Sequence, residues 1–181
     1  AEAEAEAEAA ETGGAPPVTV RAPSRSYVAQ EPMVMNATIR ENILFGAADL
    51  EGDKLEEAYQ RALYASALQK DLEIFPAGDA TEVGEKGITL SGGQKARVAL
   101  ARALFGVRPG GLVLLDDPLA AVDAHVAEHL FEEGVVKALD GTTRLLVTNQ
   151  LHLLGHEAVA RVLVMEDGRI VESGLASDLR R

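Results

Sequence analysis

The segment from Leu90 to Leu104, LSGGQKARVALARAL, contains the residues best suited to bind an anion. Ser91 is a plausible N-cap for a helix that Gly92 and Gly93 open, so unpaired backbone N–H groups and a hydroxyl would face a ligand. A phosphate suits this arrangement because the helix dipole attracts negative charge. The same glycines would also suit a tight turn that only lets the helix pack against a strand, and both interpretations stay open at this point.

Two carboxylates follow an apolar segment further along the chain. LVLLD (Leu112–Asp116) has apolar side chains on both faces, as expected for a strand buried in a parallel sheet. Asp116 would then lie at the carboxyl edge of the sheet, where it could bind Mg²⁺ directly or through water. Asp117 could orient an attacking water. The alternative is that both acids are turn and cap residues before Pro118.

Other residues that could bind a nucleotide or a metal are weaker candidates. The 181 residues contain no G-x-x-x-x-G-K-[ST] loop, which is the usual lysine-bearing site for a nucleotide. His125 and His129 are spaced i, i+4, and His152 and His156 repeat the spacing. A zinc site needs further ligands and H-E-x-x-H is absent, so solvated or packed histidines are the favoured interpretation.

The elements that must position these residues follow from periodicity and from breakers. The patterns predict, in chain order, two short β segments around Pro23, a helix from Ala48 to about Leu68, a loop from Leu72 to Ile88, a helix from Ser91 to about Phe105, a strand at 112–116, a helix at 123–139, a buried strand at Thr143–Thr148 and a hairpin around Asp167-Gly168. The fold class is therefore α/β, with right-handed βαβ connections, a parallel sheet core, a helical insertion and a C-terminal β-hairpin.

Composition narrows the class of protein. The net charge is −12, which argues against nucleic acid as the main partner, and there is no cysteine for disulfide or thiolate chemistry. No apolar run approaches the ~18 residues needed to cross a bilayer. We expect Ala1–Pro17, rich in alternating Ala and Glu, to be a low-complexity disordered tail, and residues 18–181 to form one domain. The start at Ala1 suggests an interior or incomplete piece of a longer product.

Several collinear segments together resemble the ATP-binding-cassette (ABC) ATPases, in which LSGGQ is the signature motif and an apolar strand ending in Asp is Walker B. The resemblance is greater still to the first nucleotide-binding domain of the multidrug-resistance-associated (subfamily C) transporters. It rests on YVAQEPMVMNATIRENILFG (a Q-loop region), TEVGEKGITLSGGQKARVALARAL, DDPLAAVDAHV (Walker B and D-loop) and MEDGRIVESG, and it runs from about Val18 to the end. It implies a partial P-loop NTPase domain.

The resemblance also implies a role for individual residues. It makes Gln30 the Q-loop glutamine, a Mg²⁺ or water ligand, and Asp116 a second Mg²⁺ ligand. It makes Asp123 the D-loop aspartate, which communicates across a dimer of domains. The signature residues would contact the γ-phosphate of an ATP held by the opposite domain; these are Ser91, Gly92, Gly93 and Gln94.

The family further implies the setting of the chain. Its cofactors would be ATP and Mg²⁺, and its reaction would be ATP hydrolysis coupled to export. Its partners would be a second nucleotide-binding domain and the transmembrane domains of a transporter. The chain would lie at the cytosolic face of a membrane as part of an integral membrane transporter.

Three departures from the family pattern weaken the expected chemistry. The Walker A loop should lie upstream of Val18, where this sequence has only the Ala-Glu segment. Asp117 stands where a fully active site carries Glu and is one methylene shorter, and Asn149 stands where the family has its switch histidine. All three predict a poor hydrolase of its own ATP.

Two other functions remain open on the sequence. The chain could be a truncated, non-catalytic regulatory or binding half, which the missing lysine loop favours. It could also be a soluble cassette ATPase without a transporter, but NATIRENILFG and TEVGEKG resemble segments that meet transmembrane domains and speak against this.

Overall fold

The structure of the chain is a computed structural model that describes residues 20–45, 50–84 and 87–179. The predicted disordered tail, residues 1–17, lies outside the described residues. The elements in chain order are β1 (Arg25–Val28), β2 (Ala37–Thr38), α2 (Ile39–Leu44), α3 (Gly52–Ala65), α4 (Gln69–Ile74), the short 3₁₀ turn η1 (Gly78–Ala80), β3 (Glu82–Val83), α5 (Gly92–Gly106), β4 (Leu112–Asp116), α6 (Ala124–His129), the π-helix η2 (Leu130–Ala138), β5 (Thr143–Val147), the 3₁₀ turn η3 (Leu151–Gly155), β6 (Val162–Glu166), β7 (Arg169–Gly174) and α7 (Ala176–Leu179).

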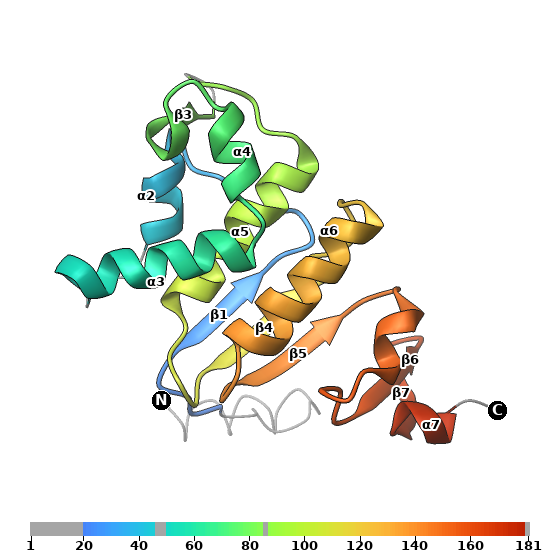
Figure 1. Cartoon of the computed structure of the whole chain (residues 1–181). Coiled ribbons are helices and arrows are strands. Elements are labelled where there is room, and N and C mark those ends of the chain that lie inside the picture. Colours follow the sequence, from blue (N-terminus) through green and yellow to red (C-terminus); the bar gives the residue numbers. More distant parts are fainter. Residues whose placement is uncertain (1–19, 46–49, 85–86, 180–181) are drawn as a thin grey trace, which may run out of the picture.

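A parallel sheet forms the centre of the described fold, with strand order β1-β4-β5. Its strands run side by side in Figure 1, with their arrowheads at the same edge. The strand predicted at 112–116 is confirmed, and so are the α/β class and the C-terminal hairpin of β6 and β7. Asp167 and Gly168, at the hairpin turn, both have positive φ (46° and 74°), as a two-residue turn of this kind requires.

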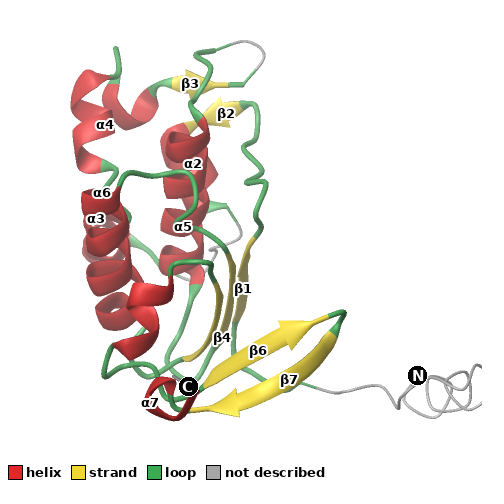
Figure 2. Ribbon diagram, turned by 90° about the vertical axis from the view of Figure 1, so that its right-hand side faces the viewer, coloured by secondary structure: helices red, strands yellow, loops and turns green. Residues whose placement is uncertain are grey.

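Within the described residues, helices cover one face of the sheet and leave the other partly exposed. Val28, Val113 and Leu115 point to the covered face and are almost fully buried. Helices α3, α5 and α6 all lie on this side of the sheet in Figure 2. Leu145 and Val147 point the other way and are about half exposed (49% and 52%), so the prediction that this segment is a fully buried strand is wrong for one of its faces.

The helical insertion between β1 and β4 packs as its own layer around α5. Tyr59, Leu63 and Leu68 are buried in it, which confirms the predicted apolar stripe, although the helix itself begins at Gly52. The predicted loop from Leu72 to Ile88 is only partly correct. It contains the second half of α4, the η1 turn and the strand β3, because Leu72 still packs against the core and β3 pairs antiparallel with β2.

Two further differences from the predicted elements are local. Of the two β segments expected around Pro23, the structure has only β1 within the described residues. The helix predicted at 123–139 is present, but its second half is the wider π-helix η2. Arg144 of β5 donates hydrogen bonds to the carbonyls of Val135 and Val136 in η2. This arginine therefore satisfies backbone acceptors near the end of that helix. Within the described residues, no helix is long and apolar enough to span a bilayer.

Candidate functional site

The LSGGQ segment (Leu90–Gln94) forms a reciprocal cap at the start of α5. The Ser91 hydroxyl oxygen accepts a hydrogen bond from the Gln94 backbone N–H at 3.2 Å. The Gln94 side-chain Oε1 accepts one from the Ser91 N–H at 2.9 Å. This capping box fixes the first turn of α5 and confirms Ser91 as the N-cap residue.

The two glycines of this segment meet different surroundings. A Cβ atom built on Gly92 would have no neighbour within 4 Å, whereas one on Gly93 would lie 2.8 Å from the carbonyl oxygen of Ala121. Gly93 is therefore needed for close packing of α5 against the loop after β4. Gly92 is exposed, and it leaves the helix N-terminus open to a ligand. The packing interpretation is therefore confirmed for Gly93, whereas the phosphate-binding interpretation stays a prediction for Gly92.

Asp116 and Asp117 lie at the carboxyl edge of the sheet, as predicted from the strand pattern. Asp116 Oδ2 accepts a hydrogen bond from the Tyr27 hydroxyl of the neighbouring strand at 3.3 Å. Partial desolvation, together with the nearby Asp116 carboxylate, raises the pKa of Tyr27, so the hydroxyl remains a donor. Asp117 has a left-handed backbone (φ 49°), and its N–H donates to the Val147 carbonyl at 2.9 Å.

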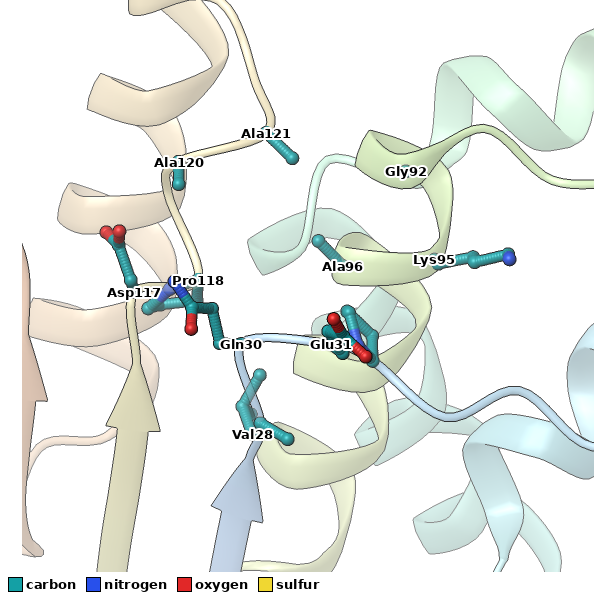
Figure 3. Close-up of a pocket in the computed structure, with 12 residues that line it drawn as sticks. Val28, Gln30, Glu31, Gly92, Lys95, Ala96, Asp117, Pro118, Ala120 and Ala121 are labelled. Atoms are coloured by element: carbon teal, nitrogen blue, oxygen red, sulfur yellow. The ribbon is translucent and has the colours of Figure 1, made fainter.

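An open pocket of about 430 Å³ lies between the end of β1, the first turns of α5 and the loop after β4. Gln30, Gly92 and Asp117 line it, so the structure brings together three residues that lie far apart in the sequence. The Gln30 side chain extends from the end of β1 toward Asp117 and Pro118, while the Lys95 side chain points away from them (Figure 3). The remaining predicted site residues are not among those that line this pocket.

Asp123 has a structural role at the start of α6. Its Oδ1 accepts hydrogen bonds from the backbone N–H groups of His125 (3.1 Å) and Val126 (3.0 Å). The hydrogen bond from Val126, and to a lesser extent that from His125, holds the pKa of the Asp123 carboxyl below its usual range. The sequence prediction did not include this N-cap.

Asn149 is exposed just beyond the end of β5, beside the edge that carries Asp116. The next residue, Gln150, donates through Nε2 to the Leu119 carbonyl at 3.0 Å and so joins the loops after β4 and β5. No role was predicted for Gln150, because the hydrophobic periodicity that predicts helices and strands gives no information on an amide side chain in a loop.

The side chains at the sheet edge are hard oxygen donors of the kind that Mg²⁺ prefers. Asp116 offers a carboxylate, and Gln30 offers an amide oxygen at the end of the adjacent strand. Asp117 Oδ1 is buried and has no hydrogen-bond partner among the described residues, which is the situation of an oxygen that a cation or a water would satisfy. The residues present therefore fit Mg²⁺.

Two of the four histidines take part in local contacts, and His125 and His152 are exposed. His129 Nε2 lies 2.7 Å from the Tyr64 carbonyl oxygen, and His156 Nε2 lies 3.0 Å from Glu132. The structure, over the residues that it describes, contains no group of three or more His, Cys, Asp or Glu side chains that could hold a metal ion.

Two arginines of α5 make contacts with other parts of the helical insertion that were not predicted from the sequence. Arg97 pairs with the buried Asp71 of α4. Arg102 donates to the backbone carbonyls of Asn42 (2.7 Å) and Met33 (3.1 Å), and burial lowers its pKa. The sequence contained one indication of the Arg97 contact. Gln94 and Arg97 are spaced i, i+3, which places both on one face of a helix.

Comparison with known proteins identifies the family. Residues 14–120 match the family model described as ABC transporter. The chain is 50% identical over 166 residues to ATP-binding cassette sub-family C member 10 of Homo sapiens, which covers 90% of this chain and 10% of that protein. It is 48% identical over 158 residues to sub-family C member 2 of Mus musculus (86% of this chain, 10% of that protein). It is 47% identical over 158 residues to the ABC-type transporter cicA of Emericella nidulans (87% of this chain, 11% of that protein).

The chain thus spans about a tenth of the length of the curated relatives that it matches. The family match covers more than half of the chain and includes the segment with the capped helix and the paired aspartates. The α/β architecture around a parallel sheet agrees with this match. The chain therefore belongs to the ABC transporter family, and it corresponds to a nucleotide-binding domain of the subfamily C type.

Proposed function

We propose that this chain couples ATP binding and hydrolysis to transmembrane export, and that its LSGGQ segment acts as a signature motif on an ATP held by a partner domain. One observation carries the proposal: the first turn of α5 is fully capped and yet open at Gly92. A phosphate can approach that turn, while the 181 residues contain no lysine loop that would hold a nucleotide. Residues 18–181 would supply this part of the nucleotide-binding domain.

Each residue of the LSGGQ segment contributes to contact with phosphate in this proposal. Ser91 offers its hydroxyl, and Gly92 exposes the backbone N–H of the first turn. Gly93 supports the turn through its packing on Ala121, and Gln94 fixes the orientation of Ser91. Asp123, in the loop after β4, would communicate with the partner domain across the same interface.

The chain's own half of a site would be a weak hydrolase. Asp116 and Gln30 would hold Mg²⁺, which when bound supplies charge neutralisation to the phosphates. Asp117 would orient water with a side chain one methylene shorter than Glu. Asn149 would offer a hydrogen bond without the charge that a histidine can carry.

The partners that follow are a second nucleotide-binding domain and the transmembrane domains of a transporter. The chain would then lie at the cytosolic face of a membrane, as part of an integral membrane protein. Its net charge of −12 supports protein partners over nucleic acid.

The test is to pair the chain with a nucleotide-binding domain that carries its own G-x-x-x-x-G-K-[ST] loop and to measure ATP hydrolysis. Ser91→Asp keeps an N-cap but places a carboxylate against the phosphate, and Ser91→Gly keeps most of the cap energy without a hydroxyl. We expect both to abolish the partner's hydrolysis while the unfolding midpoint of the chain stays close to that of the unchanged protein. Ser177→Ala, on the exposed α7, is the control. An unchanged rate in both Ser91 variants would contradict the proposal.

A second candidate function is a non-catalytic regulatory or binding half. Asp117 and Asn149, at the positions where a fully active site carries Glu and His, favour it. The same pairing experiment separates the two: a chain that binds the partner without changing its hydrolysis rate supports this second function.

A further inference from the structure

The LSGGQ segment is tied to the helical insertion through Gln94. This side chain makes two hydrogen bonds with opposite ends of its amide: Oε1 accepts from the Ser91 N–H, and Nε2 donates to Asp71 Oδ1 at 3.1 Å. Asp71 lies on α4, more than twenty residues earlier in the chain. Since the amide is engaged at both ends, the geometry of the Ser91 cap depends on the position of Asp71.

Asp71 is in turn held by a charge-assisted pair. Arg97, one turn beyond Gln94, donates through Nε to Asp71 Oδ2 at 2.9 Å and through Nη2 to Oδ1 at 3.0 Å. This is the two-pronged arrangement in which both guanidinium and carboxylate geometries are fixed. The side chains of Arg97 and Asp71 are only 15% and 11% exposed, so water screens the pair weakly.

The pair also joins two layers of the fold. Helix α4 is short, and it is anchored in the core by Leu68, which is fully buried directly before its first residue, and by Leu72, which packs against the core. Asp71 connects this helix to the first two turns of α5, where the capped N-terminus lies. A change at Asp71 would therefore release the end of α5 from the helical insertion without touching Ser91 itself.

We infer that Asp71 is a positioning residue for the LSGGQ segment: it holds Gln94, and through Gln94 the Ser91 cap, in the geometry that contacts phosphate. The effect of Asp71 on hydrolysis rests on the proposed function. Its effect on the geometry of the Ser91 cap does not. Asp71 does not reach the ligand. It acts through Gln94 and Arg97.

The first experiment measures backbone amide exchange by NMR in the chain alone, comparing Asp71→Asn with the unchanged protein. Asn keeps the shape and one acceptor oxygen but leaves the buried Arg97 without its counter-charge. We expect exchange at the Ser91 and Gln94 N–H groups to accelerate about tenfold, because hydrogen bonds to charged groups are worth more than neutral ones.

The matched control is Asp79→Asn. Asp79 is another carboxylate of the helical insertion that accepts hydrogen bonds from an arginine (Arg40, 3.2 Å) and a second donor (Tyr59 hydroxyl, 2.9 Å), and both of these partners lie outside the LSGGQ segment. It should leave exchange at Ser91 and Gln94 unchanged. Equal acceleration in both variants would overturn the inference, because Asp71 would then contribute only general stability. If Asp71→Asn does not fold, amide exchange at Ser91 and Gln94 is measured in Arg97→Lys instead. Lysine keeps the positive charge but cannot make the bidentate contact with Asp71.

The second experiment uses the paired domains described above. Asp71→Asn should lower the kcat of the partner's ATP hydrolysis by about ten- to a hundredfold, since misplaced catalytic groups lose rate steeply, with Asp79→Asn near the unchanged rate. If neither Ser91→Asp nor Ser91→Gly has an effect in the same assay, the proposed function fails and the exchange result still decides the role of Asp71. If Ser91→Asp abolishes hydrolysis while Asp71→Asn matches Asp79→Asn, the inference fails alone.

Discussion

At the scale of single residues, Gly92 and Gly93 illustrate how one repeated residue type can serve two purposes. Gly93 fills a position with no room for a side chain, because the Ala121 carbonyl lies against it. Gly92 faces open space. The first requirement belongs to the fold, and in the proposed function the open space at Gly92 serves the ligand, so substitution should separate the two.

We expect Gly93→Ala to destabilise the chain by about 1–3 kcal/mol, because a methyl group in contact with backbone forces the loop after β4 to move. Gly92→Ala should change the free energy of unfolding by no more than about 0.5 kcal/mol, since it is exposed in the first turn of a helix. It should nevertheless lower hydrolysis at the partner's site. Urea unfolding of both variants measures the stabilities, and equal destabilisation would contradict the distinction.

Asp117 shows what the sequence can and cannot predict at this scale. The pattern placed it correctly after a buried strand, and the resemblance marked it as a departure from Glu. The positive φ of 49° had no sequence signal, although Asp tolerates this backbone region better than most residues do. The unbonded Oδ1 also followed only from the packing around it.

At the scale of elements, the LSGGQ helix and the central strand were predictable, because a capping residue, a breaker and an apolar run lie next to each other in the sequence. The Asp71–Arg97 and Arg102–Asn42 contacts were not, because they join residues more than twenty positions apart. The π-helix η2 was also not predicted. Gly134 in it lies against the Ala65 carbonyl, 3.0 Å from where a Cβ would be, and this contact too joins residues that are distant in the sequence.

The N-cap of α6 gives a prediction with a defined pH dependence. Asp123→Ala should lower the melting temperature, because two backbone N–H groups lose their acceptor. Since the folded pKa of Asp123 is lowered, its contribution is complete above the ordinary carboxyl pKa of about 3.9 and is lost as the pH falls through the folded value.

Thermal unfolding between pH 7 and pH 2 checks this expectation. The deficit of Asp123→Ala relative to the unchanged chain should shrink toward low pH. Asp123→Ser retains an uncharged cap, so the contribution of residue 123 to its melting temperature should not change with pH. A deficit that stays constant over the whole range would argue against a charged cap.

At the scale of the whole molecule, the sheet has two unequal faces. The covered face carries Leu115, which is 1% exposed, and the other face carries Leu145 on the adjacent strand, which is 49% exposed. Periodicity could not distinguish these two faces, because each strand contains consecutive leucines, which point to both sides of the sheet. The difference arises from which helices of the described residues lie against each face.

We expect Leu145→Thr to change the free energy of unfolding by about 0.5 kcal/mol or less, as for other surface positions. Leu115→Ala, on the central strand, should cost about 2–5 kcal/mol because it leaves a cavity in the core. Chemical denaturation of the whole chain measures both values. A large loss for Leu145→Thr would mean that this face is covered in solution.

The placement of the helical insertion between β1 and β4 has a consequence for the order of folding. Arg25 pairs with Leu112, so the sheet closes only after the whole insertion has been brought between its strands. Doubling the length of such a loop raises the free-energy cost of closing it by only about 0.6 kcal/mol. Contacts between residues close in the sequence nevertheless form much faster than contacts between distant residues. The insertion can therefore assemble first, and we expect the capped end of α5 to form before the strand edge that carries Asp116 is in place.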